Sequence, residues 1–219
     1  MDSIILIFMF TIILVVLFVI FYLSIYYRKK MDENFKELAY RFGLNFDISS
    51  SKKWKPNVFN LYPKLHGKVK GLDIQMYNIV RGSGKSQAIY IAVDIFVGNS
   101  SSHTLRIFHE DFFRKFGKIL GLQKDIEIND SEFDGQYIVR SDNAEFAKTI
   151  LSDLVLKNKL IEEKQLFNNA VLKFENGILH YEGINNLYNK KEIDKMEARV
   201  KLAVLMAETI QAKSRENYV

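Results

Sequence analysis

The sequence predicts an α+β fold, in which one N-terminal transmembrane helix precedes a mostly antiparallel sheet with packed helices, and a long amphipathic helix ends the chain. Residues 3 to 27 carry no charged side chain, and Arg28-Lys29-Lys30 follows them directly. Between residues 64 and 183, several segments alternate apolar and polar side chains with the period of two that is typical of β-strands. Beyond residue 186, the apolar residues return to a helical spacing.

The uncharged N-terminal segment is long enough to cross a bilayer. Its 25 residues would form a helix of about 37 Å, whereas a hydrocarbon core is about 30 Å thick. A removable signal peptide is the alternative, but such peptides carry positive charge before a shorter apolar run and small residues at a cleavage site. Here only Asp2 is charged before the run, and residues 24–27 offer no such site. We therefore expect a permanent anchor.

The residues at the end of this segment predict its orientation. Tyr22, Tyr26 and Tyr27 fall where the membrane–water interface favours amphipathic rings. Positive charge follows the apolar run, as Arg28-Lys29-Lys30, and none precedes it. The positive-inside rule therefore places the N-terminus outside a cell membrane and the remaining chain in the cytoplasm.

Composition limits the chemistry of the remaining chain, which is long enough for one domain with a real core. Of 219 residues, 48% are hydrophobic and 13% aromatic, which argues against disorder. There is no cysteine, so disulfides, cysteine nucleophiles, Fe–S clusters and cysteine zinc sites are excluded. We expect three parts: the anchor with its basic flank (1–30), a short helix with a lysine-rich connection (31–63), and a globular domain with the C-terminal helix (64–219).

Positive charge is concentrated between residues 48 and 72, which hold six lysines and His66 but no acid, in a chain of net charge +5. Basic side chains near an anionic leaflet gain about 1 kcal/mol each. This segment is therefore a candidate lipid contact, and lysines that only solvate a loop and a strand face are the alternative. We expect no nucleic acid partner, because no stacking platform lies beside the lysines. The predicted membrane-contact residues are Arg28, Lys29, Lys30, Lys52, Lys53, Trp54 and Lys55.

Periodicity predicts the elements of the first half. A helix is expected from Met31 to Leu44, with Gly43 as its stop and with one apolar face formed by Phe35, Leu38, Ala39 and Phe42. Residues 47–63 hold both prolines and are expected to be a connection. Strands are then predicted at residues 64–70, 72–76, 88–97 and 105–108. The third of these is apolar on both faces and is expected to be central.

The second half begins with a helix predicted over residues 111–120, followed by strands at 126–128 and 133–139. The capping-box pattern Asp142-x-x-Glu145 predicts a helix that can run, with a break, to Phe167. Asn176-Gly177 supplies the two positive-φ residues of a type I′ hairpin turn. That register pairs Phe174 with Leu179, Leu172 with Tyr181, and Lys173 with His180.

The last helix, predicted over residues 186–213, carries a heptad seam. Two interpretations of the seam stay open: it packs against the sheet, or it forms a coiled-coil homodimer or binds a partner protein. The seam residues are Ile193, Met196, Val200, Ala203, Ala207 and Ile210.

Candidate phosphate and metal motifs fail on their spacing. Gly84-Lys85-Ser86 lacks the earlier glycine and the following helix that a phosphate-binding loop needs. His109-Glu110-Asp111 combines a histidine with two acids, but the acids fit the first turn of a helix. The acids between residues 125 and 134 have Asp130 and Gln136 where a calcium loop requires Gly and Glu. We therefore predict no catalytic, cofactor-binding or metal-binding residue.

The remaining histidines, His66, His103 and His180, are isolated in the sequence and are expected to be exposed. No Ser-His-Asp order or G-x-S-x-G pattern accompanies them.

Three short patterns resemble a group of bacterial single-pass membrane proteins of unknown function. The first is Leu38-Ala39-x-x-Phe42-Gly43-Leu44-x-Phe46, and the second is Pro63-x-Leu65-x-Gly67-x-x-x-Gly71. The third is Phe133-Asp134-x-x-Tyr137-x-Val139. The resemblance covers residues 31–184. It implies an N-terminal span, a short helix and an α+β domain, and it brings no catalytic residue with it.

Together these features predict a membrane-anchored, non-enzymatic binding or scaffold module that contacts anionic lipid through its lysine-rich segment. Self-association or binding of a partner protein through the C-terminal helix is one alternative. A hydrolytic or metal-dependent enzyme that uses His109, Glu110 and nearby acids is the other.

Overall fold

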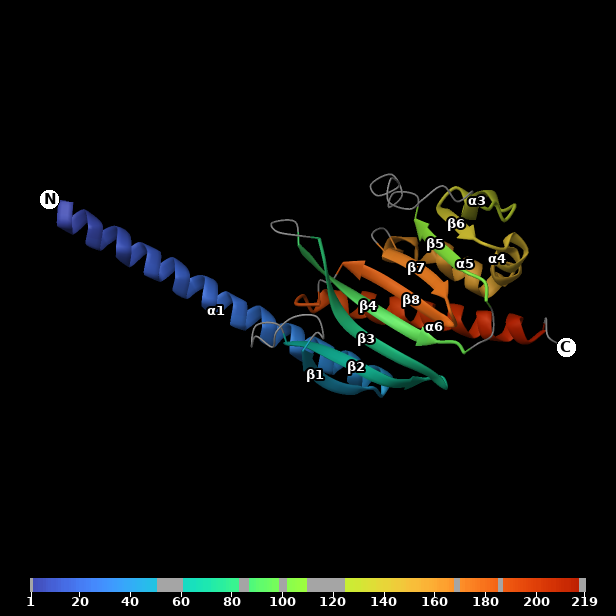
Figure 1. Ribbon diagram of the computed structural model, residues 1–219, viewed down its shortest axis with the longest axis horizontal. Helices are drawn as coiled ribbons and strands as arrows, with labels where there is room; N and C mark the ends of the chain where they lie inside the picture. The colour runs from blue at the N-terminus through green and yellow to red at the C-terminus, as the bar shows by residue number, and fades with distance from the viewer. Residues whose placement is uncertain are drawn as a thin grey trace.

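The computed structural model describes residues 2–50, 61–82, 87–98, 102–109, 125–167, 170–184 and 187–216. In these residues the chain forms an α+β fold with one eight-stranded antiparallel sheet (Figure 1). The elements are α1 (Asp2–Phe42), β1 (Asn45–Ser50), β2 (Leu61–Val69), β3 (Leu72–Arg81), β4 (Ala88–Phe96), β5 (Leu105–His109), α3 (Ser131–Asp134), β6 (Tyr137–Ser141), α4 (Ala144–Leu151), α5 (Leu154–Glu162), the 3₁₀ helix η4 (Lys164–Phe167), β7 (Ala170–Glu175), β8 (Ile178–Ile184) and α6 (Lys191–Glu216).

Helix α1 joins the apolar segment and the predicted short helix in one element of 41 residues. It is long and apolar enough to cross a membrane, and the large apolar side chains from Ile7 to Tyr27 are exposed. Its last turns are different, because Phe35 and Leu38 are fully buried in the domain core. Gly43, with φ of +65°, ends the helix as the sequence predicts. The amide of Leu44 then donates to the Ala39 carbonyl at 2.8 Å, which closes a Schellman-type cap.

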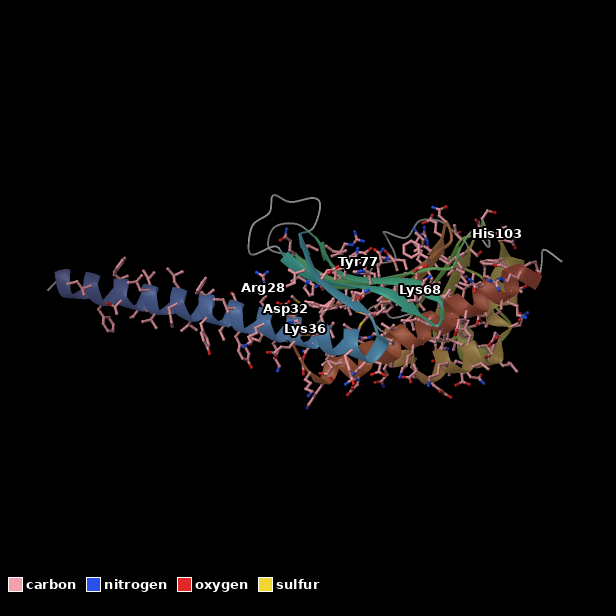
Figure 2. All side chains as sticks on the ribbon, turned by 90° about the horizontal axis from the view of Figure 1, so that it is seen from below. Arg28, Asp32, Lys36, Lys68, Tyr77 and His103 are labelled. Carbon is pink, nitrogen blue, oxygen red and sulfur yellow. The ribbon has the colours of Figure 1, made fainter. Side chains whose placement is uncertain are left out.

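The strand order is β1-β2-β3-β4-β8-β7-β5-β6, and all neighbours are antiparallel. The prediction that β4 is central is confirmed, since β4 pairs with β3 and β8. Helices α4, α5, α6 and the last turns of α1 cover one face of the sheet, and the core lies between the two layers (Figures 1 and 2). We call the opposite side of the sheet the open face.

The heptad seam of α6 faces the sheet and the other helices. All six seam residues are at most 1% exposed, from Ile193 to Ile210. The interpretation that the seam packs inside the chain is therefore confirmed. Self-association or partner binding through this helix stays a prediction, and it would have to use the exposed charged residues such as Lys195 and Lys201.

The β7–β8 hairpin has the predicted turn and register. Asn176 and Gly177 have φ of 53° and 73°, as a type I′ turn requires. Phe174 pairs with Leu179, and Lys173 pairs with His180.

Gly183 of β8 makes room for the buried Tyr181 ring. A Cβ at Gly183 would collide with the Tyr181 hydroxyl and lie 3.4 Å from the Ala170 Cβ. We expect Gly183→Ala to lower the free energy of unfolding by about 1–3 kcal/mol, as overpacked cores do. Urea denaturation in detergent measures the loss, and a Tyr181→Phe background should reduce it because the colliding oxygen is gone. An equal loss in both backgrounds would contradict this packing.

Several predicted elements differ from the structure. The segment predicted as a connection, residues 47–63, contains most of β1 and the start of β2, which pair with each other. Residues 126–128 form no strand, and 133–139 is divided between α3 and β6. Asp130 causes this division, because its side chain accepts the amides of Glu132 and Phe133 and so caps a helical turn. The helix predicted over residues 111–120 lies outside the described residues.

The long helix predicted after residue 142 is present in broken form. Asn143 caps α4 and Asp153 caps α5, each by accepting an amide three residues further on. The 3₁₀ helix η4 then continues to Phe167.

Candidate functional site

The basic flank of the apolar segment lies on the exposed stretch of α1 just before the domain. Lys29 is exposed, and Arg28 and Lys30 are half-buried. Arg28, Asp32 and Lys36 follow one another at one-turn spacing along α1 (Figure 2). Burial raises the pKa of Asp32, while the charges of Arg28 and Lys36 oppose that shift. The other four predicted membrane-contact residues, Lys52, Lys53, Trp54 and Lys55, lie outside the described residues.

The segment before α6 fixes the domain to this part of α1. The rings of Tyr27 and Tyr188 meet edge to face, with their centroids 5.7 Å apart. The buried Asn34 side chain donates a hydrogen bond to the Leu187 carbonyl. The end of the apolar segment is therefore in contact with the folded domain.

A second connection lies at the other end of the domain-packed turns of α1. Arg41 donates to Asp194 at 2.7 Å and to Glu197 at 2.5 Å, both on α6. It also bonds Glu37 on its own helix at 2.6 Å. Hydrogen bonds to Asp194, Glu197 and Glu37 raise the pKa of Arg41, so its positive charge is permanent.

The lysines of β2 lie on the open face, as the alternation predicts, because Leu65 between them is fully buried. Lys68 pairs with Asp73 at 2.9 Å, and His66 lies 3.1 Å from Asp47. Lys70 follows β2 and pairs with Glu208 of α6 at 2.9 Å. Much of this positive charge is thus balanced by nearby acids within the domain.

A polar cluster on the open face joins β3, β4 and β8. We call it the open-face network and define it as Tyr77, Arg81, Asp94, His180 and Glu182. The strand register places Asp94 directly opposite His180. The His180 Nδ1 is 2.5 Å from Asp94 Oδ1, and its Nε2 is 3.3 Å from Glu182 Oε2. The Tyr77 hydroxyl donates to the other Asp94 oxygen at 2.7 Å.

Arg81 completes the network through a two-pronged ion pair. Its Nε and Nη2 donate to the two Glu182 oxygens at 2.9 and 2.8 Å. Such fork-to-fork pairs combine charge with fixed geometry. The network therefore links the end of β3 to β8 across the intervening strand β4.

The charges of the network set its protonation. Burial alone would lower the pKa of His180, but hydrogen bonds to Asp94 and Glu182 and their negative charges raise it to about 9. Burial would raise the pKa of Glu182, but Arg81 and His180 lower it to about 2. Burial and the bond to Asp94 also raise the pKa of the Tyr77 hydroxyl. Near neutral pH, His180 is therefore an imidazolium between two carboxylates.

His66, His103 and His180 are half-buried rather than exposed as expected, and each has a polar partner. His180 belongs to the network and His66 faces Asp47. His103 Nε2 lies 3.1 Å from the Asn143 side-chain nitrogen, and its Nδ1 is 3.6 Å from Asp142. Sequence reasoning missed these contacts because they join residues that the strand pairing or the chain fold brings together.

The residues of the enzyme alternative do not form a described site. His109 packs edge to face on Tyr137, with centroids 5.8 Å apart, whereas Glu110 and Asp111 lie outside the described residues. Asp130 caps α3 and pairs with Lys157 at 2.6 Å, and Asp134 accepts the Ile128 amide. In the part of the chain that the structure describes, no group of three or more His, Asp or Glu side chains is placed to hold a metal ion.

Neither protein-family models nor curated proteins give a match to this chain. The class of protein therefore rests on the geometry: an α+β domain preceded by a helix of membrane-spanning length.

Proposed function

We propose that this chain is a single-pass membrane protein whose cytoplasmic α+β domain is a non-enzymatic binding or scaffold module held directly at the lipid surface. The observation that carries the proposal is the continuity of α1. One helix runs from an exposed apolar segment into turns whose side chains, Phe35 and Leu38, are fully buried in the core.

This continuity leaves little room for a linker. Tyr27 and Phe35 are eight residues apart, so the core begins about 12 Å along the helix from the end of the apolar segment. That separation is about one and a half Debye lengths, each about 8 Å at physiological ionic strength, so anionic lipids act most strongly on the basic side chains at the start of this stretch. The shared helix also supports a permanent anchor over a removable signal peptide. Arg28-Lys29-Lys30 after the span supports the cytoplasmic orientation.

The protonation state of His180 supports a non-enzymatic role for the open-face network. A general base must be able to accept a proton near the working pH. Both nitrogens of His180 face carboxylates, and its pKa of about 9 keeps it protonated. The Tyr77 hydroxyl is committed to Asp94, so it is not poised as a nucleophile.

Lipid contact through residues 52–55 can be tested with the intrinsic fluorophore of the chain. Trp54 is the only tryptophan. In vesicles of anionic lipid, we expect brominated lipids to quench Trp54 emission in the full-length protein. Changing Lys52, Lys53 and Lys55 together to Gln should reduce that quenching, whereas Lys195→Gln on α6 should leave it unchanged. Equal quenching before and after the triple change would end the proposal of lipid contact through these lysines.

A further inference from the structure

Exposed apolar side chains gather at one end of the sheet. Val80 is 46% exposed, Ile89 38%, Ile184 41% and Tyr188 48%. Val80 and Ile89 are direct partners across β3 and β4, and Ile184 pairs with Tyr90 on β4. Val80 and Ile89 continue the core-facing sides of β3 and β4, whereas Ile184 points to the open face. We therefore define the sheet-end patch as Val80, Ile89 and Tyr188.

The contacts of β3 place this end near the end of the apolar segment. The Asn78 side chain contacts Met31 Sδ at 4.0 Å. Met31 is four residues, or about 6 Å, beyond Tyr27 along α1. From Asn78, β3 continues for three residues to Arg81, up to about 10 Å. It runs toward the side of the domain from which α1 emerges (Figure 1). Val80 therefore reaches the level of the last uncharged turn of α1.

Tyr188 lies at the same level along α1 as Val80, but it belongs to the segment before α6 rather than to the sheet. Its ring lies against that of Tyr27, 5.7 Å between centroids, while the preceding Leu187 is fixed to Asn34. Tyr27 is the last uncharged residue before the basic flank. Tyrosine is favoured at the membrane–water interface because its ring is apolar and its hydroxyl is polar.

The charges around the patch are positive. Lys190 and Lys191 are exposed and follow Tyr188 in the chain. Arg81 and Glu182 neutralise each other through their two hydrogen bonds, so neither adds net charge here. Apolar side chains rimmed by Lys and Arg are the pattern of elements that lie in the interface of an anionic membrane.

We propose that the sheet-end patch inserts into the interfacial layer of the same leaflet that α1 enters, so that the domain touches the bilayer at a second place and keeps a fixed orientation on it. This inference rests on the proposed membrane anchor. It commits to lipid as the occupant of the patch, because α1 already holds the patch at the level of the headgroups; a protein partner at the patch is a contrary outcome.

The absence of cysteine makes single-cysteine labelling a direct test. Val80→Cys and Tyr188→Cys would each carry an environment-sensitive fluorophore in the full-length protein, reconstituted in vesicles of phosphatidylcholine and phosphatidylserine with brominated acyl chains. Val155→Cys is the matched control, because Val155 is apolar and 68% exposed. It lies on α5, in the part of the domain remote from the apolar stretch of α1 (Figure 1). Leu17→Cys, in the middle of the apolar segment, reports the span itself.

We expect the labels at residues 80 and 188 to be quenched at least about threefold more than the label at 155, since interfacial elements bury their apolar side about 5–10 Å into the bilayer. If residues 80 and 188 behave like 155 while residue 17 is strongly quenched, the second contact is wrong and the anchor stands. If residue 17 is not quenched either, both proposals fail. Protection of residue 80 only when a second protein is added would also overturn the inference.

Discussion

Phe35→Ala is expected to lower the free energy of unfolding by about 3–5 kcal/mol, the usual cost of emptying a buried aromatic site. Phe35 is fully buried, although it lies on the same helix as the exposed apolar segment. The last turns of α1 contact β1, β2 and α6, so a cavity there weakens the packing of the domain on α1. Urea denaturation in detergent, followed by near-ultraviolet circular dichroism, measures the loss.

Tyr40→Ala is the matched control on the same helix. Tyr40 is 89% exposed, so its replacement should change the free energy of unfolding by less than about 0.5 kcal/mol. If both variants were nearly neutral, α1 would be a tether outside the core and the account of its two halves would be wrong.

The second large effect is a dependence of the free energy of unfolding on pH, which His180 produces. Its pKa is about 9 in the folded protein, against an ordinary value of 6.5. The folded state thus keeps a proton that the unfolded chain has already lost. The resulting stabilisation is fully present below pH 6.5, declines between pH 6.5 and 9, and is absent above. Its size is at most about 3.5 kcal/mol, since one pKa unit corresponds to about 1.4 kcal/mol.

Glu182 makes stability depend on pH in the opposite sense, at acidic pH. Its pKa is about 2 when folded, against an ordinary 4.5, so its stabilisation is present above pH 4.5 and is lost as the pH falls toward 2. The two groups together predict greatest stability between about pH 4.5 and 6.5. Unfolding free energies measured from pH 3 to 10 would show this maximum.

We call the decline in stability between pH 6.5 and 9 the alkaline limb. Asp94→Asn should flatten this limb, because the carboxylate nearest His180 is removed. His66→Asn should leave that limb unchanged, since the His66 side chain is 41% exposed and its partner Asp47 is 58% exposed. An alkaline limb that persists in Asp94→Asn would show that the network does not hold the proton of His180.

Local signals predicted the elements whose geometry they determine. Asn176-Gly177 favours a type I′ turn by its positive φ values, and the pairing of β7 with β8 follows from it. Gly43 likewise ends α1 because it adopts a positive φ. The strand predicted at residues 133–139 failed because two signals competed. Phe133 and Tyr137 fit an alternating pattern and are both buried, but the cap from Asp130 favours a helical turn.

The continuity of α1 was harder to predict. Arg28-Lys29-Lys30 interrupts the apolar pattern, so the span and the short helix were predicted as separate elements. Between residues 28 and 42 there is no Gly or Pro, and nothing local stops the helix. Charge ends a membrane span, but it does not end a helix.

The open-face network depends on contacts distant in sequence. Asp94 and His180 are 86 residues apart, and only the pairing of β4 with β8 makes them neighbours. The hairpin signals that define β7–β8 do not show which strand β8 meets on its other side. A single sequence therefore predicted His180 as exposed, whereas the sheet order places it between two carboxylates.

Labelling with a membrane-impermeant maleimide tests the central claim most directly. In intact cells, we expect neither Leu17→Cys nor Tyr40→Cys to react. Permeabilising the cells, so that the reagent reaches the cytoplasmic side of the membrane, should make the cysteine at residue 40 react. The cysteine at residue 17 should react only after detergent removes the lipid. Reaction at residue 17 in intact membranes would show that α1 does not cross the bilayer, and reaction at residue 40 in intact cells would reverse the orientation.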